Sequence, residues 1–261
     1  MLTDKLNVLI PMAGDGIRFS NAGYILPKPL IPINGIPMIV RAIESLGFPQ
    51  ASFIFVVRKY EEEEYNRTLH ETLTAMCAQA TIIAIDYRTE GPACTALLAK
   101  ELINNDTPLI IANCDQIMEW DDQAFLRQMR DNNCDGAVVT YFSETTKNSY
   151  ARLDAQEQYV VELAEKKVIS THSLNGIHYW KKGSSFVFST EEIMRRNIRV
   201  NNEFYISMTY NILIEHGQQI QIYPIEQHMH HAVGVPEDFL RYEQYVHRKN
   251  TSFGETPHPS P

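Results

Sequence analysis

The sequence predicts an α/β fold: a mainly parallel central sheet with helices on both faces, joined by a smaller antiparallel lobe. Two observations support this prediction. Strand-sized apolar runs alternate with longer amphipathic stretches in the first half of the chain, and this β-α-β order is typical of a parallel sheet covered by helices. The second half carries shorter, more polar strand candidates, which favour antiparallel pairing. The 261-residue length fits one large domain, which we place at residues 1–248, with parts 1–145 and 146–248.

The first half supplies the expected parallel sheet. Five β-branched or apolar runs are expected to be buried strands: NVLIPM (7–12), SFIFVV (52–57), TIIAI (81–85), PLIIAN (108–113) and GAVVTY (136–141). The helices expected between them cover residues 38–47, 60–76 and 92–103. Gly47 suits the position after a helix, and Pro92 suits the first residue of one. Ligands in this architecture gather at the carboxyl ends of the strands, so functional residues are expected just after these runs.

The second half is expected to add the antiparallel lobe. Its strands are predicted at residues 150–154, 159–166, 175–180 and 219–225, and its helices at 189–197, 204–216 and 236–248. The Pro-, Ser- and Gly-containing end of the chain, residues 249–261, is typical of a disordered tail.

Composition narrows the classes of protein. Hydrophobic residues make up 44% and charged residues 21%, which is typical of a globular protein without a membrane span. The chain carries 23 Lys and Arg against 32 Asp and Glu, and a net charge of −9 argues against nucleic-acid binding. The four cysteines show no C-x-x-C spacing and the N-terminus has no signal-peptide pattern, so we expect a cytoplasmic protein with buried, inert thiols.

A glycine-rich loop with two cations follows the first strand. Gly14 and Gly16 let the backbone approach a ligand and turn N–H groups towards phosphate oxygens. Neither a Walker A loop nor a dinucleotide fingerprint is present, because Gly-Lys-Ser/Thr is absent and Phe19 stands where the third glycine would be. Arg18 and Lys28 supply fixed positive charge, which a phosphate-rich substrate needs. A plain tight turn with surface cations is the alternative interpretation.

Taken together, the segment IPMAGDGIRF…PKPLIPINGIPMI resembles the opening signature of the sugar-phosphate nucleotidyltransferases, the nucleoside-diphosphate-sugar pyrophosphorylases. The resemblance continues to about residue 245 and implies a Rossmann-like, three-layer α/β/α fold. It implies that residues 1–145 bind the nucleotide, that residues 146–248 bind the acceptor, and that the substrates are an NTP and a phosphorylated small molecule, preferably a sugar 1-phosphate. Arg18 would contact the leaving pyrophosphate and Lys28 the reacting phosphates. The nucleotide-binding residues implied are Met12, Ala13, Gly14, Gly16, Tyr87, Gly91 and Asn113.

Asp115 is the candidate metal ligand. It follows the strand-like run 108–113, and a carboxylate there suits Mg²⁺, which combines a few carboxylates with waters and substrate phosphates. The resemblance implies that Asp115 binds this Mg²⁺ and is catalytic together with Arg18 and Lys28. An aspartate in this position can also be a simple turn or helix cap.

The acceptor-binding residues also come from the resemblance. VELAEKKV is similar to the V-E-K-P element of the family, in which the glutamate binds sugar hydroxyls and the lysine binds the acceptor phosphate. NGIHYW resembles the strand that follows, and NNEFYISMTYN stands at a helix start of the family. The acceptor candidates are Glu165, Lys166, Asn175, Gly176, Glu203 and Tyr205.

The chain departs from the family pattern at two places. Tyr87 and Pro92 stand where relatives carry a base-reading Gln and a glycine, so the nucleobase stays open. Ala232 stands where many relatives carry a second metal carboxylate. A subgroup of the family with short chains shows the same loss, and some of its members act on phosphorylated small molecules other than sugar phosphates. A cytidylyltransferase for a non-sugar substrate, a glycosyltransferase of the related nucleotide-binding fold and a non-catalytic nucleotide-binding module are therefore alternatives. A paired acidic D-x-D motif, usual in the glycosyltransferases, is absent at Asp115.

Three nearby histidines, His228, His230 and His231, could bind zinc, but we prefer a polar rim of the acceptor pocket, since no further ligand is evident. Many relatives self-associate, so the resemblance is compatible with a homo-oligomer. We expect no left-handed β-helix of the kind that some relatives append.

Overall fold

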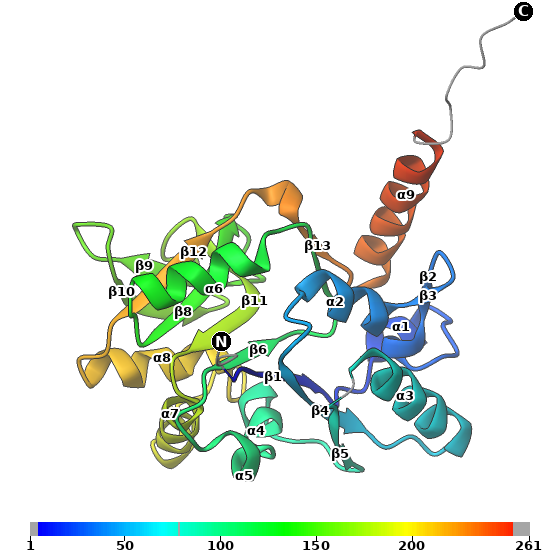
Figure 1. Ribbon diagram of the computed structural model, residues 1–261, viewed down its shortest axis with the longest axis horizontal. Helices are drawn as coiled ribbons and strands as arrows, with labels where there is room; N and C mark the ends of the chain where they lie inside the picture. The colour runs from blue at the N-terminus through cyan, green and yellow to red at the C-terminus, as the bar shows by residue number, and fades with distance from the viewer. Residues whose placement is uncertain (1–4, 78, 253–261) are drawn as a thin grey trace, which may run out of the picture.

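A nine-stranded mixed sheet forms the centre of the computed structural model, which describes residues 5–77 and 79–252 (Figure 1). Its strands are β1 (Asn7–Met12), β4 (Ser52–Arg58), β5 (Thr81–Ile85), β6 (Leu109–Ala112), β8 (Gly136–Phe142), β9 (Ser149–Leu153), β10 (Val160–Glu165), β11 (His172–Trp180) and β12 (Ile220–Pro224). The order is β5-β4-β1-β6-β11-β8-β12, and β9 and β10 extend from β11.

Strand direction separates the two halves of the sheet. β1 runs parallel to β4 and β6, and β4 runs parallel to β5. β11 is antiparallel to both β6 and β8, so it separates the parallel half from the parallel pair β8 and β12. β9 and β10 form the antiparallel lobe beside it. The predicted α/β class with an antiparallel addition is confirmed.

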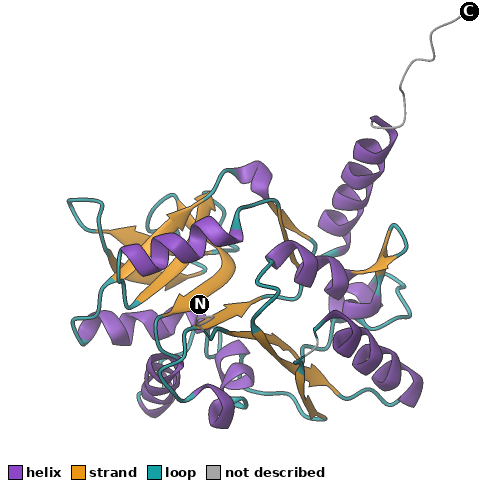
Figure 2. Cartoon of the chain, viewed as in Figure 1, coloured by secondary structure: helices purple, strands orange, loops and turns teal. Residues whose placement is uncertain are grey.

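Helices cover both faces of the sheet, as Figure 2 shows. One core contains residues of α4 (Pro92–Leu97), α5 (Lys100–Ile103), α7 (Gly183–Arg195) and α8 (Ile206–Glu215). The other contains residues of α2 (Met38–Leu46), α3 (Glu63–Met76) and α6 (Asp122–Asp131). Successive residues of β1 alternate between these cores: Leu9 packs in the first, and Val8 and Ile10 pack in the second. The central strands β1, β4 and β6 are largely apolar because both of their faces are buried.

A third, smaller core lies beside the first loop. Its residues come from α1 (Ile17–Asn21), β2 (Pro32–Ile33), the start of α2, β7 (Gln116–Met118) and α9 (Pro236–Ser252). The 3₁₀ helix η1 (Lys28–Leu30) precedes β2, β3 (Ile36–Pro37) pairs with β2, and β13 (His230–Ala232) pairs with β7. Phe19 of α1 packs edge-on against Phe239 of α9, with ring centroids 5.8 Å apart. The rest of α9 projects from the body of the molecule (Figure 1).

The predicted element boundaries need several corrections. The predicted helix 92–103 is two helices, because the N–H groups of Leu98 and Ala99 bond three residues back and tighten the turn between them. The helix predicted at 189–197 begins at Gly183, since Phe186 and Val187 pack in the first core despite their low helix propensity.

The end of the chain also differs from the prediction. α9 continues to Ser252, so a disordered tail from residue 249 is wrong for residues 249–252, and residues 253–261 lie outside the described residues. The sequence did not predict α1, η1, β2, β3, β7, α6, η2 (Gln227–Met229) or β13. Within the described part of the chain, no helix combines the length and apolarity needed to traverse a bilayer.

Candidate active site

The carboxyl ends of β1 and β6 open onto a cavity of about 480 Å³, which we call the first cavity. Of the predicted nucleotide-binding residues, those that line it are Met12, Ala13, Gly14, Gly16, Gly91 and Asn113. Gly16 has a φ of +65°, and a Cβ there would lie 3.2 Å from Cβ of Lys28. The glycine therefore lets the loop turn into α1 and pack against the segment that carries the lysine.

Lys28 and Asp115 meet inside the first cavity. The Lys28 ammonium lies 2.5 Å from Oδ2 of Asp115, and the two side chains are only 15% and 17% exposed. Burial acts to lower the pKa of Lys28, but the neighbouring Asp115 carboxylate outweighs it, so the pKa is raised and the lysine is charged. Gly234 closes over this pair, since a Cβ there would lie 2.5 Å from the same carboxylate oxygen.

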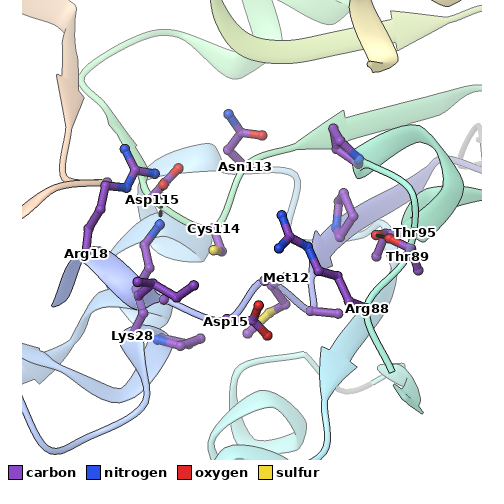
Figure 3. Close-up of a pocket in the computed structure, with 18 of the residues that line it drawn as sticks. Met12, Asp15, Arg18, Lys28, Arg88, Thr89, Thr95, Asn113, Cys114 and Asp115 are labelled. Atoms are coloured by element: carbon purple, nitrogen blue, oxygen red, sulfur yellow. Dashed lines mark hydrogen bonds and ion pairs between the residues drawn. The ribbon is translucent and has the colours of Figure 1, made fainter. Parts of the chain in front are cut away.

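Arg18 completes the positive side of the cavity. It lies on α1, exposed to solvent, and lines the cavity together with Lys28 and Asp115. Figure 3 shows these three side chains gathered on one side, with Arg88, Thr89 and Thr95 on the other. The opening loop and the carboxyl end of β6 therefore bring two cations and one carboxylate together. This arrangement suits a polyphosphate.

The side of the cavity near Tyr87, which we expected to contact the nucleobase, differs from the prediction. Tyr87 is 52% exposed and is not among the residues that line the cavity. Its neighbours Arg88 and Thr89 line the wall instead, and the Thr89 and Thr95 hydroxyls lie 2.6 Å apart. The only sequence signal for Arg88 was its position next to Tyr87. The sequence does not show which of two neighbouring loop residues faces a cavity.

The sequence predicts four buried, unreactive cysteine thiols, but only two of the four cysteines are buried. Cys77 and Cys134 are buried, whereas Cys94 and Cys114 are half-buried. Cys114 lines the first cavity, and burial raises its pKa to about 11. Its thiol is therefore protonated near neutral pH and is a poor nucleophile.

A second cavity of about 290 Å³ adjoins the first, and Pro92 and Asn113 line both. The predicted acceptor residues that line this second cavity are Glu165, Asn175, Gly176 and Tyr205. Gly176 has a φ of +99°, and a Cβ there would lie 2.2 Å from Nδ2 of Asn113. β11 pairs with β6 from Ile177 onward, which places Asn175 and Gly176 beside the end of β6.

Glu165 is half-buried and lines the second cavity. Its Oε2 accepts hydrogen bonds from the hydroxyls of Ser149 and Ser207, the latter at 2.9 Å. Burial raises the pKa of Glu165 despite these two bonds. The side chain is thus fixed in position beside neutral polar groups.

The other two acceptor candidates lie elsewhere. Glu203 lines the first cavity and pairs with Arg88, at 3.3 Å. Lys166 lies exposed, and its ammonium donates to the hydroxyl of Tyr205, at 2.7 Å. Neither side chain lines the second cavity.

The three histidines diverge. His230 lines the second cavity beside Tyr141, with ring centroids 4.6 Å apart, while His231 lies 3.3 Å from Glu119 and exposed His228 lies 3.1 Å from Glu226. Across residues 5–77 and 79–252, no group of three or more His, Cys, Asp or Glu side chains is placed to hold a metal ion. The zinc alternative is therefore not supported, and a polar rim describes His230 only.

The donor set at Asp115 fits a hard cation that brings its own ligands. Asp115 is a carboxylate next to fixed positive charge, and Ala232 offers no side-chain oxygen where relatives have an aspartate. Mg²⁺ commonly binds through one or two carboxylates together with waters and substrate phosphates. The residues present are therefore compatible with Mg²⁺ delivered with a nucleotide.

Comparison with known proteins shows that this chain is similar to nucleotidyl transferases. The family described as "Nucleotidyl transferase" matches residues 8–247. Mannose-1-phosphate guanylyltransferase catalytic subunit beta from Xenopus tropicalis is 23% identical over 258 residues, covering 94% of this chain and 67% of the relative. The chain therefore spans about two thirds of the length of that relative. The Danio rerio protein of the same name is 23% identical over 241 residues, covering 90% of this chain and 63% of the relative.

Solved structures show the same fold. The nucleoside-diphosphate-sugar pyrophosphorylase from Vibrio cholerae RC9 superposes with a TM-score of 0.78 at 23% identity, covering 91% of this chain and 99% of the other. A putative glucose-1-phosphate thymidylyltransferase from Bacillus anthracis gives a TM-score of 0.74 at 15% identity, covering 93% and 95%. UDP-glucose pyrophosphorylase complexed with UDP-glucose gives 0.73 at 16% identity, covering 94% and 99%.

Proposed function

This chain belongs to the nucleotidyl transferase family, and from that premise we propose that it joins a nucleoside triphosphate to a phosphorylated small molecule, preferably a sugar 1-phosphate. A phosphate oxygen of the acceptor attacks the α-phosphorus of the nucleotide. The bond from that phosphorus to the bridging oxygen breaks, and the electron pair leaves with pyrophosphate. The products are a nucleoside diphosphate sugar, or its equivalent, and pyrophosphate.

The observation that carries this proposal is the junction of the two cavities. The first cavity has the cations and the glycine loop, and the second has a half-buried glutamate among hydroxyl and amide groups. Because Asn113 and Pro92 line both, two ligands bound in them would meet at these residues. Holding two reactants in contact removes a large part of the entropy cost of a bimolecular step, about 7 kcal/mol or more in favourable cases.

The charged residues have separate tasks in this reaction. Lys28 orients the nucleotide phosphates, and Arg18 neutralises charge on the departing pyrophosphate. Lys166, just outside the second cavity, receives the acceptor phosphate. Asp115 is the residue that would hold Mg²⁺, which when bound offsets negative charge on the phosphates. In the structure Asp115 forms an ion pair with the Lys28 ammonium.

GTP and mannose 1-phosphate are the first substrates to test, because several relatives are named mannose-1-phosphate guanylyltransferases. The assay measures pyrophosphate release with each of ATP, GTP, CTP and UTP. Each nucleotide is paired with mannose 1-phosphate, glucose 1-phosphate, a phosphorylated alditol and a phosphorylated amino alcohol. We expect release that needs both substrates, stops when EDTA removes divalent metal, and is lost in Asp115→Ala. Asp131→Ala, an exposed aspartate outside both cavities, is the matched control.

Other outcomes would contradict the proposal. Transfer of sugar from a ready-made nucleotide sugar, without pyrophosphate release, would indicate a glycosyltransferase. Nucleotide binding without turnover on the whole panel would indicate a binding module. Activity confined to CTP and a phosphorylated amino alcohol would keep nucleotidyl transfer and overturn the sugar preference.

A further inference from the structure

The segment 203–205 lies between the two cavities and contributes to both. Glu203 lines the first cavity and Tyr205 lines the second. We call residues 88–91, which border the first cavity, the nucleotide-side loop. The backbone of Phe204 is hydrogen-bonded at the end of this loop: its N–H donates to the carbonyl of Glu90 at 2.8 Å, and its carbonyl accepts from the N–H of Ala93 at 3.0 Å. The two cavities therefore share a backbone connection here.

This connection is tightly packed. Gly91 has a φ of +130°, and a Cβ there would lie 2.5 Å from the Phe204 nitrogen, so only glycine fits. The guanidinium of Arg199 lies over the Phe204 ring at 3.9 Å and pairs with Glu90 at 2.5 Å. Movement of the loop at Gly91 must therefore carry the segment 203–205 with it.

A row of side chains crosses the same boundary. Arg88 lies 3.3 Å from one oxygen of Glu203, and the other oxygen accepts a hydrogen bond from the Tyr205 hydroxyl at 2.9 Å. That hydroxyl accepts from the Lys166 ammonium at 2.7 Å, and the ammonium lies 4.9 Å from the centroid of the Tyr205 ring. We call these four residues the bridge. It begins at a wall of the first cavity and ends at a lysine beside the second.

We propose that Glu203 and Tyr205 are positioning residues that hold the Lys166 ammonium beside the second cavity and connect it, through Arg88, to the occupant of the first cavity. The inference rests on the proposed function, in which the first cavity takes the nucleotide and Lys166 meets the acceptor phosphate. It adds that the two substrates influence each other's binding through the bridge.

The chemistry of the bridge supports this assignment. A lysine side chain is a flexible four-carbon stem, and without a fixed partner its ammonium samples many positions. The hydrogen bond to Tyr205 raises the pKa of Lys166, so the fixed group stays charged. Tyr205 in turn has an oriented hydroxyl because it donates a hydrogen bond to the Glu203 carboxylate. An anion in the first cavity competes with Glu203 for Arg88. When Arg88 pairs with that anion, the Glu203 carboxylate loses its partner and presents more negative charge to Tyr205 and Lys166.

The kinetic test separates acceptor from nucleotide. Tyr205→Phe keeps the ring but removes the hydroxyl, and we expect the acceptor KM to rise about tenfold, as for the loss of one hydrogen bond to a charged group. The nucleotide KM should stay within about twofold. Tyr159→Phe, which removes a hydroxyl outside both cavities, is the control. Equal acceptor KM values for the two variants would overturn the proposal.

Arg88 gives a sharper test because it lines only the first cavity. Arg88→Met should nevertheless raise the acceptor KM about threefold, a small effect because the pair with Glu203 is partly exposed. In the Glu203→Gln background the same change should add nothing, since the bridge is already broken. An undiminished effect in that background would contradict the connection.

Lysine labelling tests the bridge without requiring activity. Trace acetylation with acetic anhydride, followed by mass spectrometry, compares Lys166 with its exposed neighbour Lys167. We expect Lys166 to react at least about threefold more slowly in the wild-type protein and to approach Lys167 in Tyr205→Phe. GTP should change the Lys166 rate in the wild type but not in Glu203→Gln. If Lys166 and Lys167 react equally in the wild type, the bridge is wrong, whereas a protected Lys166 in a protein that releases no pyrophosphate would contradict only the proposed function.

Discussion

Replacing Asp115 by alanine should destabilise the folded protein as well as stop the reaction. The change leaves the Lys28 ammonium without its partner at 2.5 Å, in a position where only 15% of the lysine side chain is exposed. Removing one member of a buried ion pair costs about 3–5 kcal/mol. Since both side chains retain some exposure, we expect the lower value, about 3 kcal/mol.

The measurement is urea unfolding of four proteins: wild type, Asp115→Ala, Lys28→Met and the double variant. With an m-value of about 3 kcal/mol per molar, the Asp115→Ala midpoint should fall by about 1 M. The double variant should be more stable than the sum of the single effects predicts, because it buries no unpaired charge. A change below about 0.5 kcal/mol in Asp115→Ala, or strict additivity in the double variant, would refute this reasoning.

Three further predictions concern other parts of the site. Arg18→Ala should lower kcat/KM about 100-fold or more while changing the free energy of unfolding by less than about 0.5 kcal/mol, because the side chain is exposed and acts on developing charge; a melting curve and steady-state kinetics check both parts. Gly91→Ala should cost about 3–5 kcal/mol through its φ of +130° and the contact with Phe204, whereas Gly14→Ala, with open space around it, should unfold like the wild type. Burial lowers the pKa of His178 from 6.5 to about 3, so below pH 6.5 the unfolded chain binds a proton that the folded protein does not bind, and the free energy of unfolding should fall by about 1.6 kcal/mol between pH 6.5 and pH 5. His178→Leu should remove that part of the pH dependence, and an unchanged slope in urea titrations at the two pH values would count against it.

The strands that carry the site could be predicted because their residues are buried on both faces. The run LIIA of β6 is buried at all four positions, so its sequence is continuously apolar and contains no polar, solvent-facing residue. The place of Asp115 just after this strand could be predicted from the parallel architecture, whereas its proposed role came from the family resemblance. The insertion of β11 between β6 and β8 did not follow, since strand pairing between segments far apart in the sequence has no local signal.

The short elements were missed for a related reason. α1 is held by Phe19 in the third core rather than by its own five residues, and helices of that length are not stable alone. α6 is different, because its signal was present: Asp121 caps it by accepting from the N–H of Ala124, and Phe125 and Met129 repeat at helical spacing.

Most of the predicted site residues do line one of the two cavities, but the placement predicted for some of them was wrong. Glu203 was expected beside the acceptor but lies in the first cavity, because Gly91 draws the backbone of Phe204 against the nucleotide-side loop. Tyr87 points out of the cavity that its neighbour Arg88 lines. Both differences depend on loop geometry of a few ångströms, which side-chain pattern does not encode.

The packing of α9 on α1 has a consequence for any attempt to shorten this protein. In the described part of the chain, the lining of both cavities ends at Gly234, before α9 begins. A chain that ended at Gly234 would keep every residue that lines the two cavities. It would lose Phe239, whose ring packs against Phe19, the residue next to Arg18. The last helix thus supports the segment that carries Arg18 from outside the lining of both cavities.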